Sequence, residues 1–150
     1  MSDSFANYPS LRNKRVLITG GASGIGAEMV KCFVEQGSDV TLIDNDTAAI
    51  ERLAGALAPA NCQSIVCDLT DTPDLQASIQ EAVSKNGGFD VLVNSAARDD
   101  RHQWQDVTEA EFDTRIATNI KHMFFATQSV APAMIENGSG SIINMGSNSW

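Results

Sequence analysis

The chain has 150 residues, of which 43% are hydrophobic and 19% are charged, and its formal net charge is -9. This mixture is typical of one globular domain with a buried core and excludes a disordered chain. An acidic chain without a basic patch repels phosphate backbones and anionic lipid. Nucleic-acid binding and membrane binding are therefore excluded as leading functions, and the scattered lysines and arginines are interpreted as solvated surface charges.

Neither a targeting segment nor a metal site is expected. The start of the chain, MSDSFANYPSLRNK, lacks a basic beginning and an apolar core, and no stretch approaches the roughly 20 apolar residues of a membrane span. We therefore expect a cytoplasmic protein. Cys32, Cys62 and Cys67 are odd in number and have no metal-type spacing, so we expect reduced packing residues. His102 and His122 have no partner at ligand spacing.

Apolar β-branched runs alternate with amphipathic stretches along the whole chain. Strands are predicted at residues 16–18, 40–43, 64–66, 91–93 and 141–145, and helices at residues 24–36, 47–57, 73–84 and 108–135. Short connections between strands and helices are the pattern of a parallel sheet that right-handed crossovers cover on both faces. The sequence therefore predicts a doubly wound α/β fold.

The stretch TGGASGIG joins the first predicted strand to the first predicted helix. Gly20, Gly24 and Gly26 leave room for backbone N–H groups and the positive helix N-terminus to face a pyrophosphate. Thr19 and Ser23 can add hydroxyl donors. The spacing G-x-x-x-G-x-G differs from the commoner G-x-G-x-x-G, and an ordinary glycine-rich turn is the alternative reading of the glycines taken alone.

Asp44 ends the second predicted strand, 44 - 26 = 18 positions after Gly26. An acid near this distance accepts hydrogen bonds from ribose hydroxyls and repels a 2'-phosphate. Two like charges about 4 Å apart at an effective dielectric near 20 cost about 4 kcal/mol, and no lysine or arginine follows in DNDTAA. NAD is therefore favoured over NADP. The alternative role, a helix N-cap, fits Asp46 better.

Strand, glycine turn, helix and acidic residue together indicate a single Rossmann-type dinucleotide-binding domain over residues 1–150. Such a sheet usually has six strands in the order 3-2-1-4-5-6, and the sequence shows five. We therefore expect the C-terminal part of the fold to be absent after the fifth strand.

The motifs TGGASGIG, CDLT, VLVNSAA, RIATNIKHMFFATQ and GSIINMGS, together with Asp44, resemble the short-chain dehydrogenase/reductase family from about Lys14 onward. The resemblance implies an oxidoreductase that transfers a hydride between a hydroxyl-bearing substrate and NAD. It implies that Asp68 meets the adenine. The implied cofactor-binding residues are Gly20, Ser23, Gly24, Ile25, Gly26, Asp44, Asp68, Leu69, Asn94 and Ala96.

The same resemblance places Ser147 and Asn119 in the catalytic set. Ser147 would hold the reacting oxygen, and Asn119 would hold a water that relays the proton. The family's Tyr-x-x-x-Lys pair does not follow Ser147, and Tyr8 has no lysine four residues on. We therefore expect the 150-residue polypeptide by itself to be inactive.

The family's Asn-Asn-Ala-Gly is replaced here by the residues Asn94, Ser95, Ala96 and Ala97. A shorter hydroxyl stands in place of a side-chain amide, and an alanine stands in place of a flexible glycine. We expect cofactor binding to survive both changes.

The stretches NSAARDDRH and GSIINMGSNSW are similar to a narrower branch, the bacterial NAD-dependent aldose 1-dehydrogenases of xylose and galactose type. This similarity implies oxidation of the anomeric hydroxyl of a pyranose. Asp99, Asp100, Arg101 and His102 would cluster to clamp sugar hydroxyls, and a solvated or subunit-contacting loop is the alternative. The implied substrate residues are Asp99, Arg101, His102, Ser149 and Trp150, although Trp150 equally fits a core position.

The long helix predicted at residues 108–135 has a broader apolar surface than one sheet face requires. In the family this helix builds a subunit interface, so a homotetramer or homodimer is implied, and a buried crossover helix is the alternative. The apolar residues are Phe112, Ile116, Ile120, Met123, Phe124, Phe125 and Val130.

Two other functions fit parts of the sequence. A non-catalytic NAD-binding fragment or sensor would keep the glycines and Asp44, but it has no use for both Ser147 and Asn119. A short-chain keto-reductase acting on a lipid or acyl carrier predicts an apolar substrate loop, which the charged RDDRH disfavours.

Overall fold

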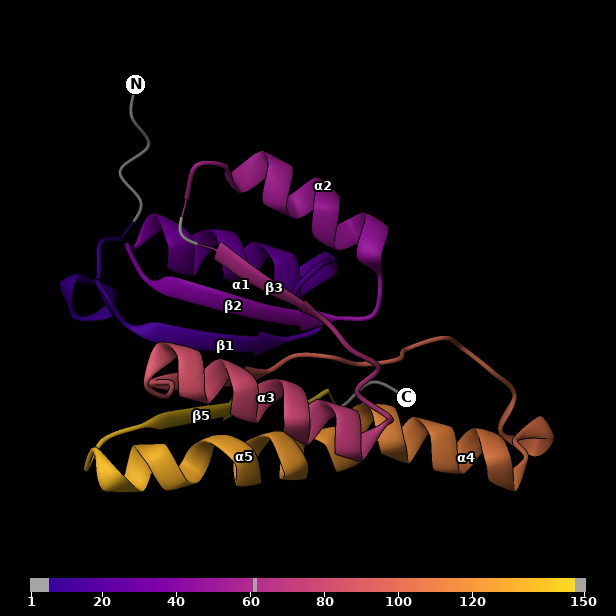
Figure 1. Cartoon of the computed structure of the whole chain (residues 1–150). Helices are drawn as coiled ribbons and strands as arrows, with labels where there is room; N and C mark the ends of the chain where they lie inside the picture. Colours follow the sequence, from indigo (N-terminus) through magenta and orange to yellow (C-terminus); the bar gives the residue numbers. More distant parts are fainter. Residues whose placement is uncertain (1–5, 61, 148–150) are drawn as a thin grey trace.

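A parallel sheet of five strands forms the centre of the computed structural model, which describes residues 6–60 and 62–147 (Figure 1). The strands lie in the order β3-β2-β1-β4-β5, and every neighbouring pair is parallel. This order confirms the predicted doubly wound fold. The strands are β1 Arg15–Thr19, β2 Asp39–Asp44, β3 Cys62–Val66, β4 Val91–Asn94 and β5 Ser141–Asn144.

Helices cover both faces of the sheet (Figure 1). Helices α1 Gly24–Glu35 and α2 Thr47–Leu57 pack on one face, against Val16, Ile18 and other residues of one apolar cluster. Helices α3 Thr72–Asn86 and α5 His122–Glu136 pack on the other face, in a second cluster that contains Leu17 and Leu92. Consecutive strand residues thus alternate between two cores, as the period of a strand requires.

Local polar groups fix where the helices begin and end. Asp46 caps α2 by accepting a hydrogen bond from Ala49 N at 2.9 Å, so its predicted N-cap role is confirmed. Asp71 caps α3 in the same way, and Gly87 ends α3 in the left-handed conformation with φ 73°. These two residues explain why α3 is longer at both ends than predicted.

The long helix predicted at residues 108–135 is present, but it is not a regular α-helix throughout. The segment consists of α4 Glu109–Ile116, the π-helical segment η3 Ala117–Lys121 and α5. Within η3 the hydrogen bonds span one residue more than in an α-helix, and the N–H of His122 donates to the carbonyl of Ala117, five residues back. Apolar periodicity does not register such a local widening, which often occurs at functional sites.

Two short 3-10 helices complete the described part, η1 Pro9–Leu11 and η2 Trp104–Asp106. The three cysteines are free, and Cys67 is buried as expected. Cys32 is exposed, so its assignment as a packing residue was wrong. Among the described residues, no helix is long and apolar enough to cross a bilayer, and no group of three metal-ligating side chains converges.

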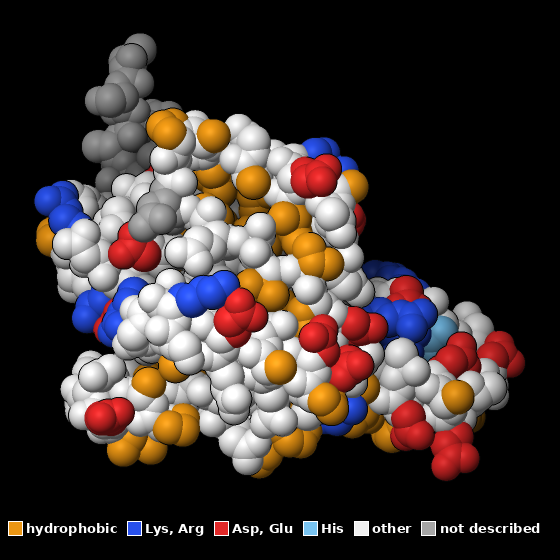
Figure 2. Space-filling model, viewed as in Figure 1, with side chains coloured by type: hydrophobic (Ala, Val, Ile, Leu, Met, Phe, Trp, Pro, Cys, Tyr) orange, Lys and Arg blue, Asp and Glu red, His pale blue; other side chains and the backbone are white. Residues whose placement is uncertain are grey.

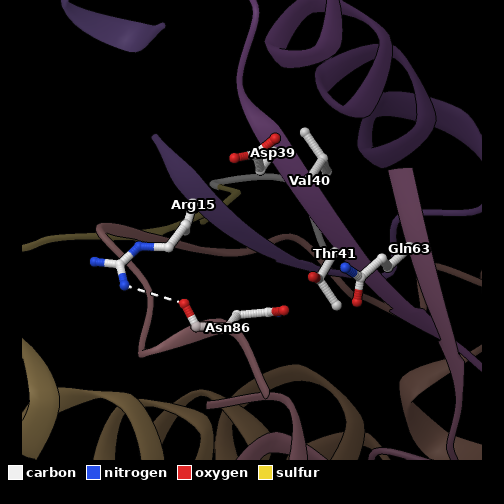
Figure 3. A pocket seen from close by; sticks show the side chains of 6 residues that line it. All are labelled: Arg15, Asp39, Val40, Thr41, Gln63 and Asn86. Carbon is white, nitrogen blue, oxygen red and sulfur yellow. Dashed lines mark hydrogen bonds between the residues drawn. The ribbon is translucent and has the colours of Figure 1, made fainter. Parts of the chain in front are cut away.

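Arg15 ties the start of β1 to the end of α3 and to the loop before β4. Its Nε donates to Asp90 Oδ2 at 3.0 Å, and its Nη2 donates to Asp90 Oδ1 at 3.2 Å. Figure 3 shows the bond that its Nη1 donates to the carbonyl of Asn86 at 3.2 Å. The same side chain lines a small pocket of 140 Å³ with Asp39 and Thr41. This pocket lies at the amino ends of the strands, away from the predicted site.

The Arg15–Asp90 pair generates a stability prediction. Asp90→Asn is expected to lower the free energy of unfolding by roughly 2 kcal/mol, because it weakens several hydrogen bonds between partly buried charged groups. Urea denaturation measures the change. The exposed Lys85–Glu81 pair provides the control, and Lys85→Gln should leave the urea midpoint unchanged. Equal effects of the two substitutions would contradict this account.

The same pair predicts the pH dependence of stability. The hydrogen bond from Arg15 lowers the pKa of Asp90 below its ordinary value of 3.8. The folded state therefore favours the ionised carboxylate, and this contribution is fully present above the unfolded pKa. It should be lost as the pH falls through the lowered folded pKa, and Asp90→Asn should remove this part of the acid destabilisation.

Candidate functional site

The carboxyl ends of the strands meet at one edge of the sheet, where open parallel sheets bind ligands. Thr19 ends β1 and lies in register with Asn94, which ends β4, and Asn94 lies in register with Asn144 of β5. Asp44 ends β2 at the same edge. Asp44 and Asn94 are the last residues of their strands, and the other predicted cofactor-binding residues follow β1, β3 and β4 in the chain.

The glycine turn after β1 is packed so closely that side chains would not fit. A Cβ on Gly26 would lie 1.9 Å from the carbonyl oxygen of Gly20, and a Cβ on Gly20 would lie 2.5 Å from Cα of Ala96. The N–H of Gly20 donates to the carbonyl of Ile43 at 2.8 Å, which fixes the turn to the end of β2. Gly20 and Gly26 thus hold the turn against α1, β2 and the loop after β4.

The start of α1 has the features of an anion site. Ser23 is the N-cap, but its side chain makes no capping hydrogen bond. The first N–H groups of a helix have no carbonyl partner within the helix, so those of α1 can donate to a ligand. Gly24 has φ +53°, and a Cβ there would meet no atom within 4 Å. Ile25 is exposed. Open space in front of a positive helix end fits a phosphate-bearing group.

Asp44 connects the glycine turn to the end of β2. Its Oδ2 accepts a hydrogen bond from Ala22 N at 3.0 Å, and its Oδ1 accepts one from Asp46 N at 3.1 Å. A carboxylate oxygen can accept more than one hydrogen bond, so both oxygens retain acceptor capacity for hydroxyl groups. The turn therefore fixes the orientation of Asp44.

The loop after β3 places Asp68 and Leu69 differently. Asp68 is exposed, and its Oδ1 accepts hydrogen bonds from the N–H and the hydroxyl of Thr70 at 2.9 and 2.8 Å. Leu69 is buried and belongs to the core that α3 and α5 cover. The Asp68 side chain lies at the surface and can reach a ligand. The Leu69 side chain is buried in the core, so only the main chain of Leu69 could contact one.

Asn119 lies in the π-helical segment and fastens the loop after β4. Its Oδ1 accepts from the N–H of Arg98 at 2.7 Å, and its Nδ2 donates to the carbonyl of Arg98 at 3.2 Å. The amide thus satisfies both main-chain groups of one residue. The sequence singled out Asn119 but gave no sign that Arg98 is its partner.

In the charged loop after β4, Asp100 is the residue with the most ion-pair contacts. Asp100 binds Arg98 through two hydrogen bonds of 2.5 and 3.2 Å and binds Arg115 of α4 at 2.9 Å. The hydrogen bond from Arg98 lowers the pKa of Asp100. Asp100 therefore pairs with two arginines outside the group Asp99, Asp100, Arg101 and His102, and the role of that group towards sugar hydroxyls stays a prediction.

The remaining members of this loop have fewer contacts. Asp99 and Arg101 are exposed and have no hydrogen-bond or ion-pair partner within the described ranges. His102 Nδ1 lies 3.3 Å from the carbonyl of Asp100. Their polar groups are therefore accessible, whereas the charge of Asp100 is compensated.

The end of β5 brings Ser147 to the same edge of the sheet. Met145 N donates to the carbonyl of Asn94 at 2.9 Å, and Asn94 Nδ2 donates to Asn144 Oδ1 at 2.8 Å. Ser147 follows this pairing and is exposed. Ser149 and Trp150 lie outside the described residues.

Sequence reasoning missed one buried pair beneath the site, Thr19 and His122. Both side chains are fully buried, and Thr19 Oγ1 lies 3.4 Å from His122 Nε2. Burial lowers the pKa of His122 below its ordinary value of 6.5. The carbonyl of Thr118 opposes this shift, although Nδ1 has no partner at hydrogen-bond geometry among the described residues. A histidine within the otherwise apolar stretch HMFFA was the available signal.

Comparison with known proteins agrees with this arrangement. Residues 14–149 match the family model of the short chain dehydrogenases. The chain is 47% identical over 98% of its length to a D-xylose 1-dehydrogenase of Caulobacter vibrioides and 42% identical over 95% of its length to a "Probable galactose dehydrogenase" of Rhizobium meliloti. It covers 58% and 57% of those two proteins, so it spans less than two thirds of their length.

Solved structures show the same fold. The crystal structure of gox2181 superposes with a TM-score of 0.85 at 28% identity, covering 93% of this chain and 56% of that one. A short-chain dehydrogenase from Streptomyces avermitilis superposes with a TM-score of 0.80 at 29% identity, covering 86% of this chain and 47% of that one. The carboxyl edge of the sheet thus belongs to a fold that dehydrogenases share.

The two glycines of the turn differ in a testable way. Gly26→Ala should lower the free energy of unfolding by about 3 kcal/mol, because its Cβ collides with the backbone of Gly20. Gly24→Ala meets no atom and should cost about 1 kcal/mol, from its positive φ alone. Urea denaturation of both variants makes the comparison. A Gly26→Ala variant as stable as Gly24→Ala would show that the turn is not packed as described.

Proposed function

Because the chain belongs to the short-chain dehydrogenase family, we propose that it is the cofactor-binding part of an NAD-dependent dehydrogenase that oxidises the anomeric hydroxyl of an aldose. One observation carries the choice of cofactor. The carboxylate of Asp44 is held beside the open start of α1 by the N–H of Ala22 in the glycine turn. We propose residues 1–150 as one dinucleotide-binding domain.

The residues around the turn have distinct proposed roles. The first N–H groups of α1, at Gly24, Ile25 and Gly26, would bind the pyrophosphate, with the Ser23 hydroxyl as a further donor. Asp44 would accept hydrogen bonds from the ribose hydroxyls and repel a 2'-phosphate. NAD supplies the hydride acceptor when it is bound.

Other loops at the carboxyl edge would complete the cofactor site. Asp68, with the main chain of Leu69, would lie at the adenine, and Asn94 and Ala96 would line the side next to β4. The structure supports this assignment in that Ala96 lies against Gly20 and that these loops follow neighbouring strands. No lysine or arginine stands between Asp44 and Arg52 to attract a 2'-phosphate.

Two residues of this chain would act on the substrate. Ser147 would donate a hydrogen bond to the reacting hydroxyl oxygen and orient it. Asn119 would hold a water through the main chain of the π-helical segment, because its side-chain amide is occupied by Arg98. The Tyr-x-x-x-Lys pair of the family is absent from the 150 residues. We therefore propose that this polypeptide by itself does not turn over a sugar.

An aldose is the proposed substrate, as the names of the relatives suggest. The loop offers accessible polar groups that can hydrogen-bond sugar hydroxyls, on Asp99, Arg101 and His102. Asp100 instead forms ion pairs with Arg98 and Arg115. Ser149 and Trp150 follow Ser147 in the sequence and are proposed for the same pocket.

We also propose that α4, η3 and α5 form a subunit interface of a homotetramer or homodimer. Phe112, Ile116, Ile120 and Phe124 are exposed on this side. Orange side chains gather along the lower edge of the molecule in Figure 2, where Figure 1 places α5. Val130 is instead fully buried in the core, so the apolar residues of this segment divide between two faces.

Asp44 supplies the test of the cofactor assignment. Calorimetric titration of the full-length protein should give tighter binding of NAD than of NADP. Asp44→Ala should weaken NAD binding roughly tenfold or more through lost charge-assisted hydrogen bonds, and it should narrow the preference over NADP.

Asp46→Ala is the matched control, because it removes a carboxylate two positions away that only caps α2. It should lower stability by about 1 kcal/mol and leave the cofactor preference unchanged. If Asp44→Ala retained full NAD affinity, the cofactor assignment would be wrong.

A further inference from the structure

We propose that His122 is a positioning residue for the cofactor site, where it orients the Thr19 hydroxyl that holds the loop after β4 in place. His122 is the first residue of α5, and its ring reaches the end of β1, with Nε2 3.4 Å from Thr19 Oγ1. Both side chains are fully buried, so neither group can exchange this contact for water. The inference rests on the proposed function, because the loop is assigned there to the cofactor.

The donors and acceptors around Thr19 Oγ1 decide which partner donates in the Thr19–His122 hydrogen bond. Thr19 Oγ1 lies 3.2 Å from Ser95 N and 3.4 Å from Ala96 N, and backbone N–H groups can only donate. The hydroxyl oxygen therefore accepts from both, which occupies its two lone pairs. Its own hydrogen remains, and His122 Nε2 is the acceptor within reach. The ring must then be neutral, with its hydrogen on Nδ1.

The hydroxyl matters most for Ala96. Ser95 N–H also reaches the main-chain carbonyl of Thr19 at 3.2 Å, whereas Ala96 N–H has only the hydroxyl as a partner within the described residues. Ala96 in turn lies against Gly20, where an added Cβ would come within 2.5 Å of its Cα. The rotation of the Thr19 hydroxyl determines where the lone pairs of its oxygen point. It therefore determines how the loop after β4 is held against the glycine turn.

The π-helical segment and the first residue of α5 both hold the loop after β4. Asn119 holds the main chain of Arg98, and His122, three positions later, acts on Ala96 through Thr19. The loop is thus fixed at two points by one stretch of helix. A regular α-helix would turn residues 119 and 122 by a different angle relative to the sheet.

The alternative is an ordinary packing histidine, and the buried nitrogen argues against it. Nδ1 of His122 has no partner at hydrogen-bond geometry in the described part of the chain, and an unpaired buried polar group is destabilising. An apolar side chain would fill the same space without this cost. His122 therefore contributes through its interaction with Thr19 and not through packing alone.

Among the residues that the structure describes, no ionised side chain contributes to the pKa shift of the ring. The groups that face it, the Thr19 hydroxyl of β1 and the Thr118 carbonyl of η3, do not titrate, and the pKa of His122 responds to burial and to that carbonyl. Protonation of His122 itself would therefore be the one event that removes the acceptor.

The test compares His122→Leu with His122→Gln in the full-length protein. Leucine fills the space without an acceptor, whereas the glutamine amide oxygen can accept the Thr19 hydrogen. His122→Leu should weaken NAD binding roughly tenfold without lowering the melting temperature, and His122→Gln should bind within about threefold of the wild type. Equal NAD affinity in His122→Leu and the wild type would overturn the proposal.

A double-mutant cycle tests whether the effect passes through Thr19. Thr19→Val, which removes the hydroxyl at nearly constant volume, should weaken NAD binding to a similar degree. The double variant with His122→Leu should then show no further loss. Additive losses would overturn the proposal, because they would mean that His122 acts by another route.

A pH titration keeps the proposal testable even if His122→Leu does not fold. NAD affinity of the wild type should hold just below pH 6.5 and fall as the pH drops through the lowered pKa of His122, since an imidazolium cannot accept a hydrogen bond. His122→Gln should not show this decline. The same decline in His122→Gln would overturn the assignment.

Hydrogen exchange separates this inference from the proposed function. Protection of the Ala96 amide, measured without any cofactor, should be lost in His122→Leu and Thr19→Val and retained in His122→Gln. If NAD failed to bind the wild type while this pattern held, the cofactor assignment would be wrong and the positioning role would stand. Unchanged protection of Ala96 in His122→Leu would overturn the positioning role itself.

Discussion

The close approach of Gly20 to Ala96 is the contact on which the rest of the site depends. It brings the turn after β1 against the loop after β4, which is feasible only because Gly20 has no Cβ. The turn is held from the other side by Ile43 and Asp44 of β2. Three neighbouring strands thus fix one turn, and the open start of α1 faces outward as a consequence.

At the carboxyl edge of the sheet, negative side chains lie next to positive groups. The whole chain is acidic, yet the start of α1 carries the partial positive charge of a helix N-terminus, and Asp44 stands beside it. On the other side, Asp100 is neutralised by Arg98 and Arg115. A dinucleotide would therefore meet a local positive end within a protein whose overall charge repels long polyanions.

Local patterns in the sequence predicted the strands, the glycine turn and the Asp46 cap, because each depends on neighbours a few residues apart, whereas the strand order came from the usual order of the doubly wound fold. The π-helical segment was not predicted, since one widened turn leaves the apolar periodicity of the helix almost unchanged. The Thr19–His122 and Asp100–Arg115 contacts were also missed. They join residues of different elements, and only the fold brings them together.

The most direct measurement is a crystal structure of the full-length protein with NAD bound. The account predicts the pyrophosphate at the first turn of α1, beside Gly24 and Ile25, and both hydroxyls of the adenine-side ribose within hydrogen-bond distance of Asp44. The nicotinamide would extend toward the ends of β4 and β5. A dinucleotide bound elsewhere, or one bound at this edge without contact to Asp44, would contradict the central claim.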